Sequence, residues 1–224
     1  MKFAIVIPAR KNSKSIKNKN RFKINGKALI EYTLKQSLLS KIKLKFVITD
    51  DAKIKKISKK YKFNTSYIRP KHTSTDKSST VDTLIHFVKS TVDKYEYDYL
   101  VVLQPTSPLR SYRDIIESVK MIKKNKSESL FSISESLEHP YENIILQKNK
   151  KWKYLLQDAK KFHRRQDFNI ETFFINGAIY IVSIKYLLKS KKMFSKNHSL
   201  YKMPKNRSLD INDYDDLELA KKIL

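Results

Sequence analysis

Short apolar runs alternate with helical stripes of apolar residues along most of the chain. Each run is nearly continuous, as is typical of strands that a sheet buries on both faces. The runs predict strands at residues 3–7, 45–49, 65–68, 99–103, 130–134 and 178–182. The stripes predict helices at residues 29–39, 79–92, 115–122 and 213–224. Alternation of the two indicates an open α/β sheet with right-handed crossovers.

Two helix starts carry capping signals. Asp50 and Asp51 offer carboxylates that can cap a further helix running through Tyr61. Ser79 and Asp82 have the spacing of a capping box at the start of the helix predicted there. In open α/β sheets, ligands bind beyond the carboxyl ends of the strands. We therefore expect the chemistry in the loops that follow residues 7, 68 and 103.

Residues 138–170 interrupt this alternation. They are polar, basic and aromatic, and they include Trp152, Tyr154 and Phe162. Such a stretch is either an excursion that packs on a partner or a long flexible loop. The chain has no internal repeat, and 224 residues suit one domain. We predict a single domain over residues 1–224 with the excursion inside it.

Composition excludes several classes of protein and of site. With no Cys, the chain cannot hold disulfides, zinc–thiolate sites, iron–sulfur clusters or a thiol nucleophile. With 2 Gly and 6 Pro, it is neither collagen-like nor a Gly/Pro-rich disordered chain. No apolar run approaches the ~18 residues that span a bilayer. We expect a soluble protein of the reducing cytoplasm with no membrane partner.

The formal net charge is +26, which favours nucleic acid, an anionic membrane or a phosphorylated ligand. Lysine is abundant almost everywhere, so a solvated basic surface accounts for most of this charge. Residues 1–30 are the exception, because they hold nine basic residues and no acidic one. No RNA-binding signature or aromatic stacking platform accompanies them, so a nucleic-acid partner is not expected. A basic nucleic-acid-binding protein of this fold remains a rival interpretation.

Two loops after predicted strands hold candidate binding residues. In the first, a serine hydroxyl lies among cationic side chains, a combination that suits a polyphosphate. The cationic residues are Arg10, Lys14, Lys17 and Lys19. The glycine-rich P-loop and dinucleotide signatures are absent from it, and the alternative is an exposed basic loop without a ligand. In the second, prolines rigidify a loop that holds Gln104 and Arg110. Its alternative is an ordinary turn.

A candidate metal-binding segment lies near the carboxyl terminus. Asp210 and Asn212 fall on one face of a short extended segment, and two hard oxygen ligands suit Mg²⁺. The alternative is that Asn212 or Asp213 caps the last helix. The five histidines have no metal-ligand spacing, and His86 is interpreted as structural.

These loops, in this order, resemble those of the acylneuraminate cytidylyltransferases, the CMP-sialic acid synthetase family. The resemblance covers nearly the whole chain. Its matching stretches are residues 7–10, 13–14, 19–20, 69–70 with Asp76, 102–110, 176–181, 203–204 and 208–210.

The resemblance implies a Rossmann-like nucleotide-diphospho-sugar transferase fold, with an open, mostly parallel sheet and helices on both faces. It implies a Mg²⁺-dependent homodimer in which residues 138–170 reach over the partner. The reaction would join CMP from CTP to the anomeric hydroxyl of a nine-carbon 2-keto sugar acid of sialic, legionaminic or pseudaminic type, releasing pyrophosphate. The product would supply surface glycans such as lipopolysaccharide, capsule or glycosylated flagellin. The enzymatic rival is a 3-deoxy-manno-octulosonate cytidylyltransferase, although residues 104–110 and 176–181 favour nine-carbon acids.

The family's functional residues carry over onto matched positions. Arg10 and Lys19 would stabilise the charge on the departing pyrophosphate, and Asp210 with Asn212 would hold Mg²⁺. The residues expected to contact the nucleotide are Ser13, Lys14, Asn20, Arg69 and Asp76. Those expected to contact the sugar are Gln104, Tyr180 and Arg165, the last from the neighbouring subunit.

The chain departs from the family pattern at three places. Lys11 and Asn12 replace two glycines of the phosphate-binding loop, and the extra lysine offers a compensating charge. Asn212 stands where a second aspartate is common. The segment between Arg165 and Asn176 is one residue longer than usual.

Overall fold

The computed structural model describes residues 1–11, 13, 15–70, 79–148, 150–161, 168 and 170–224. The strands of its main sheet are β1 (Phe3–Pro8), β4 (Leu44–Ile48), β5 (Tyr99–Leu103), β6 (Ser129–Glu135), β9 (Phe173–Ser183) and β10 (His198–Lys202). They are ordered β10–β6–β9–β5–β1–β4, and of these strands β9 alone is antiparallel to its neighbours. The helices are α1 (Leu29–Leu39), α2 (Ala52–Lys60), α3 (Thr80–Thr91), α4 (Tyr112–Asn125), α5 (Ile184–Ser190) and α6 (Tyr214–Ile223).

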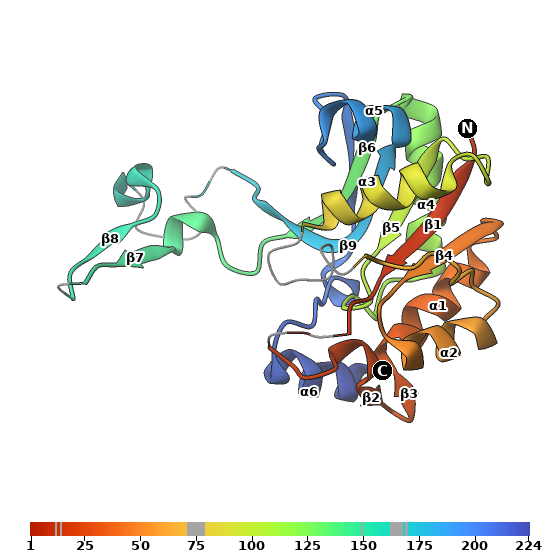
Figure 1. Ribbon diagram of the computed structural model, residues 1–224. Helices are drawn as coiled ribbons and strands as arrows, with labels where there is room; N and C mark the ends of the chain where they lie inside the picture. The colour runs from red at the N-terminus through yellow and green to blue at the C-terminus, as the bar shows by residue number, and fades with distance from the viewer. Residues whose placement is uncertain (12, 14, 71–78, 149, 162–167, 169) are drawn as a thin grey trace.

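Helices cover both faces of the sheet because its strands are apolar on both sides. Ile5 and Ile7 of β1 belong to a core shared with α1, α2 and α4, whereas Ala4 and Val6 belong to a core shared with α3 and α5. Figure 1 shows α3 lying across the near face of the sheet. Alternate burial of this kind is the basis of the near-continuous apolar runs in the sequence. The predicted α/β fold is therefore confirmed.

A third apolar cluster joins the two ends of the chain. Leu217 and Ala220 of α6 pack with Ile16 and with Ile24 of a small hairpin. The hairpin is formed by β2 (Lys23–Ile24) and β3 (Lys27–Ala28). This packing holds the segment before α6 beside the loop that follows β1.

An arm projects from the body of the molecule (Figure 1). It consists of the 3₁₀ turn η3 (Pro140–Glu142), β7 (Ile144–Leu146), β8 (Trp152–Tyr154) and the 3₁₀ turn η4 (Gln157–Lys161). The arm occupies the segment that breaks the sequence pattern, and β7 and β8 pair as an antiparallel hairpin. Among the described residues, no helix combines the length and apolarity needed to cross a membrane.

The predicted strand at residues 65–68 is wrong. The chain makes one isolated bridge to the sheet, between Asn64 and Phe46, and then leaves it. The Asn64 side chain accepts hydrogen bonds from Ser66 N at 2.9 Å and Ser66 Oγ at 2.7 Å. A local side-chain acceptor of this kind competes with a sheet ladder for the backbone.

The predicted helix caps can be compared with the observed ones. The caps by Asp51 and Ser79 are confirmed, since each side chain accepts a hydrogen bond from a backbone N–H of the first helical turn. Asp213, one of the two alternatives for the last helix, caps α6. The sequence analysis missed β10 and α5, which are a half-exposed edge strand and a helix of seven residues.

A buried ion pair fixes the chain just before Asp210. Asp114 is fully buried in the first turn of α4. It accepts hydrogen bonds from Arg207 Nε at 3.1 Å and Arg207 Nη2 at 2.8 Å, and others from Ser111 and Tyr201. Burial by itself raises the pKa of Asp114, but the hydrogen bonds from Arg207 and Ser111 outweigh it and leave that pKa below its usual 3.8. The carboxylate is thus stabilised in its charged form.

Asp114→Asn is expected to lower the free energy of unfolding at pH 7 by about 2–4 kcal/mol. Removing the charge breaks a pair whose Arg207 side chain is 36% exposed, so the loss is smaller than for a wholly buried pair. A depressed pKa contributes stability that is complete above pH 3.8 and is lost as the pH falls through the folded-state pKa. Urea unfolding from pH 7 to pH 3 should show wild type and variant converging at the acid end. A gap that does not change with pH would contradict the assignment.

Candidate active site

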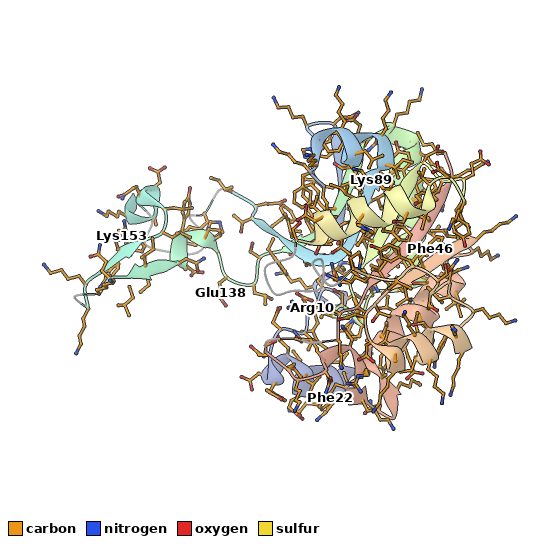
Figure 2. All side chains as sticks on the ribbon, in the orientation of Figure 1. Arg10, Phe22, Phe46, Lys89, Glu138 and Lys153 are labelled. Carbon is orange, nitrogen blue, oxygen red and sulfur yellow. The ribbon has the colours of Figure 1, made fainter. Side chains whose placement is uncertain are left out.

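A cavity of about 310 Å³ opens at the carboxyl ends of β1 and β5. It brings together six residues that the sequence analysis singled out, namely Arg10, Ser13, Lys19, Asn20, Arg69 and Gln104. The remaining lining residues are Pro8, Thr80, Thr83, Pro105 and Thr106. The three threonines were missed, because a hydroxyl in a loop or a first helical turn has no distinguishing pattern in one sequence. In the view of Figure 2, Arg10 lies in the half of the body that faces the arm.

The cavity concentrates positive charge. Burial lowers the pKa of Arg69, with Asp50 opposing and the neighbouring Arg10 adding to the shift. Arg69 also donates to Thr83 Oγ1 at 3.2 Å, which orients its guanidinium. Asn20 Nδ2 donates to the Arg10 carbonyl at 3.1 Å and so fixes the loop after β1. Positive charges confined in one space repel each other, which makes their charged forms less stable. A polyanionic ligand would relieve this repulsion, so such a cavity favours one.

Lys19 connects this cavity to the carboxyl-terminal part of the chain. Its Nζ donates to the carbonyl of Ile211 at 2.8 Å and to that of Asn212 at 3.1 Å. Burial lowers the pKa of Lys19, and the charge of Asp210 is the main opposing influence. The Thr106 carbonyl accepts from Ile211 N at 2.8 Å, which pins the same segment to the loop after β5. Asp210 is thus held behind the cavity wall formed by Lys19 and Thr106.

The Asp210 carboxyl group is partly buried and incompletely paired. Burial raises its pKa, while Thr106, Asn212 and the Lys19 charge lower it. Oδ2 accepts from Asn212 Nδ2 at 3.3 Å. Oδ1 is buried, and among the described residues no hydrogen bond to it has regular geometry, although Thr106 lies near enough to the carboxyl group to lower its pKa. An orphaned buried carboxylate oxygen is costly unless a ligand satisfies it.

The residues present fit a Mg²⁺ ion that takes most of its ligands from substrate and water. No group of three or more His, Asp or Glu side chains in the described ranges could hold a metal alone. Mg²⁺ at phosphate sites commonly binds through one or two carboxylates and the phosphates themselves. Asn212 donates from Nδ2 to Asp210, so its amide serves here as a donor to the predicted ligand. For the Asn212 amide oxygen to bind the ion as well, the amide group must rotate so that its oxygen replaces its nitrogen.

Tyr180 lies beside Asp210. A Cβ placed on Gly177 would be 3.8 Å from Asp210 Oδ2 and 3.9 Å from Tyr180 Oη, so the three residues border one space. Burial raises the pKa of Tyr180, and the Asp210 charge adds to the shift. The Phe194 ring packs against that of Tyr180 with centroids 6.0 Å apart. Of the two predicted sugar contacts that the structure describes, Gln104 therefore lines the cavity and Tyr180 lies next to Asp210.

Three predicted site residues, Lys14, Asp76 and Arg165, lie outside the described residues, and so does Asn12. His86 bonds the Tyr67 hydroxyl through Nδ1 at 2.8 Å, in keeping with a structural role.

The chain is similar to curated cytidylyltransferases along its whole length. It is 32% identical to an N-acylneuraminate cytidylyltransferase of Escherichia coli over 98% of this chain and 51% of that protein. It is 28% identical to a pseudaminic acid cytidylyltransferase of Campylobacter jejuni over 99% of this chain and 95% of that protein. The chain thus spans about half the length of the first relative and nearly all of the second.

A solved structure and a family model also match the chain over nearly its whole length. A CMP:2-keto-3-deoxy-manno-octonic acid synthetase complexed with CTP aligns with a TM-score of 0.73, at 17% identity, over 100% of this chain and 98% of that one, which shows a shared fold. The family model described as "Cytidylyltransferase" matches residues 4–223. With its cationic cavity, its Asp210 carboxylate and a match over nearly every residue, the chain belongs to the cytidylyltransferase family.

Proposed function

We propose that the protein transfers CMP from CTP to the anomeric hydroxyl of a nine-carbon 2-keto sugar acid, of sialic, legionaminic or pseudaminic type. One observation carries the proposal. The cavity gathers Arg10, Lys19 and Arg69, and Lys19 also lies close enough to Asp210 to interact with its charge, so the cationic and acidic groups would share one triphosphate. The named activities of the relatives at 28–32% identity support nine-carbon acids. Likeness to the octonic acid synthetase concerns the fold alone.

In the proposed reaction, the anomeric oxygen attacks the α-phosphorus of CTP in line. The new oxygen–phosphorus bond forms as the bond from the α-phosphorus to the bridging oxygen breaks, pyrophosphate leaves with the electron pair, and the hydroxyl proton passes to water. Negative charge grows on the leaving group. Arg10 and the third N–H of Lys19 supply fixed positive charge for it.

Asp210, with Asn212 if its amide turns, would hold Mg²⁺. When bound there, the ion supplies charge neutralisation and orientation of phosphate oxygens. Ser13, Asn20 and Arg69 line the same cavity and would hold the nucleotide. Gln104 and Tyr180 would face the sugar, and the proposal keeps Lys14 and Asp76 as nucleotide contacts.

We extend the proposal to a homodimer formed through the arm. On the paired strands β7 and β8, the side chains of Ile144, Leu146, Trp152 and Tyr154 share one face, since alternate residues of a strand point the same way. Leu146 is 72% and Trp152 56% exposed. A lone two-stranded hairpin with an uncovered apolar face is marginally stable, so a second copy is the expected cover. Arg165 of this segment would then reach the partner's sugar.

The proposal is tested by pyrophosphate release from CTP and Mg²⁺ across a panel of neuraminic, legionaminic and pseudaminic acids. We expect release with at least one of them. Release with 3-deoxy-manno-octulosonate alone would select the rival.

Asp210→Ala is expected to abolish CMP-sugar formation, a fall in kcat of about 10³-fold or more, because it removes the carboxylate proposed to hold Mg²⁺. The fold should stay intact by circular dichroism. Asp215→Ala, an exposed carboxylate in the first turn of α6, is the matched control and should keep wild-type turnover. Full activity of Asp210→Ala would remove the metal assignment.

Arg10→Ala is expected to lower kcat by about 10²-fold, because the charge that it supplies is needed most as pyrophosphate departs. The measurement is steady-state kinetics with varied CTP. Arg113→Ala removes an exposed arginine of α4 and should leave kcat unchanged. A variant of Arg10 that changes only the KM for CTP would argue against the leaving-group role.

Trp152→Asp is expected to convert the dimer to monomer without unfolding the body, because it places a charge on the apolar face of the arm. Lys153→Asp places the same aspartate on the opposite face of the hairpin and should leave the dimer intact. Analytical ultracentrifugation measures both. A dimeric Trp152→Asp variant would mean that this face is not the interface.

A further inference from the structure

Strand β9 carries a bulge of four residues where it passes the candidate active site. Phe131 of β6 pairs with Tyr180, yet Ile133 pairs with Ile175, so residues 176–179 lie opposite Ser132 alone. Gly177, within the bulge, has a φ of +73°, a left-handed conformation that favours glycine. Bulges beside active sites redirect side chains that a regular ladder would point elsewhere. This one brings Gly177 up to the space between Asp210 and Tyr180.

The Asn176 side chain holds the bulge from one side. It is 1% exposed, and each of its polar atoms is used. Oδ1 accepts from Ser132 Oγ at 2.6 Å and from Ala178 N at 3.2 Å. Nδ2 donates to Ser208 Oγ at 3.0 Å and to Met203 Sδ at 3.4 Å. Since Ser208 is two residues before Asp210, this amide ties the bulge to the segment that carries the carboxylate.

The Arg110 guanidinium holds the bulge from the other side. It is 1% exposed and donates to the Ala178 carbonyl at 2.6 Å, to the Gln104 carbonyl at 3.1 Å and to Thr33 Oγ1 at 2.8 Å. Burial lowers the pKa of Arg110 to about 9, with Asp114 opposing. A cation buried among neutral acceptors is costly, because they replace the lost hydration only in part, and Arg110 Nε has no acceptor among the described residues. Through it, the bulge is joined to Gln104 in the cavity wall.

We propose that Asn176 and Arg110 are positioning residues that act through the β9 bulge. Together they fix where Asp210 and Tyr180 lie relative to Gln104. The inference rests on the proposed function, because its consequence is the relative placement of nucleotide, metal and sugar groups. Neither residue touches the cavity in the described structure. Their effect passes through Ser208 to Asp210, and through the carbonyls of Gln104 and Ala178.

The test compares Asn176→Ala, Ser208→Ala and Arg110→Lys with the wild-type protein. Displacement of reacting groups by about 1 Å costs about 10²-fold in rate. We expect kcat to fall about 10–100-fold for Asn176→Ala and Arg110→Lys, and a few-fold for Ser208→Ala, with the KM for CTP within about 2-fold of wild type. Arg110→Lys keeps the charge and loses the forked donor, so its loss of rate separates placement from charge.

A second readout needs no turnover. Mn²⁺ binding in the presence of CTP and absence of sugar, followed by electron paramagnetic resonance, should weaken about 10-fold for Asn176→Ala and measurably for Ser208→Ala. The matched control is Asn64→Ala. Asn64 also makes side-chain hydrogen bonds, to Tyr95 and Ser66, but away from the cavity lining. It should lose thermal stability and keep both kcat and Mn²⁺ affinity.

Two results would overturn the inference in different ways. If Asn176→Ala and Ser208→Ala keep wild-type kcat and Mn²⁺ affinity and lose only thermal stability, as Asn64→Ala does, the bulge is structural and the proposed function stands. If Asn176→Ala does not fold, Ser208→Ala decides by the same measurements. If the wild-type protein neither releases pyrophosphate nor binds Mn²⁺ with CTP, the proposed function fails and the inference fails with it.

Discussion

The buried ammonium of Lys19 joins parts of the chain that are 192 residues apart, and the geometry of the site depends on it. Its hydrogen bonds to the carbonyls of Ile211 and Asn212 draw the segment before α6 against the loop after β1. Together with the packing of α6 on Ile16 and Ile24, they hold the Asp210 carboxylate beside the cationic cavity. Burying this charge is unfavourable, and nearby acidic groups, Asp210 first among them, offset part of the cost.

Several elements converge on the Asp210 segment, which explains how one carboxylate can be placed closely without a rigid helix beneath it. The Asp114–Arg207 pair anchors the chain before it, and the Thr106 carbonyl holds the residue after it. Asn176 ties it to β9 through Ser208. Each contact comes from a different part of the fold, so the segment has little freedom to shift as a unit.

Much of the fold follows from patterns that are local in sequence. The apolar runs of β1, β4 and β5 and the caps at Asp51 and Ser79 could be predicted because each is encoded within a few residues. The meeting of cationic and acidic segments followed from the family resemblance and from the rule that ligands gather at strand carboxyl ends. The hydrogen bonds that Lys19 donates, the β9 bulge and the Asp114–Arg207 pair could not be predicted, since each joins residues brought together only by folding. The strand expected at residues 65–68 failed for the opposite reason, because a hydrogen bond within three residues outcompeted the sheet.

The chain contains two glycines, and both have a positive φ. Seven other residues of the described chain adopt the same left-handed backbone, and all are asparagine or lysine. Lys126 and Lys191 do so at the ends of α4 and α5, positions that glycine commonly fills in other proteins. Lysine thus adopts the left-handed conformation at two helix ends, whereas glycine adopts it beside Asp210. A lysine or asparagine at that position would place a side chain in the space that Asp210 and Tyr180 border.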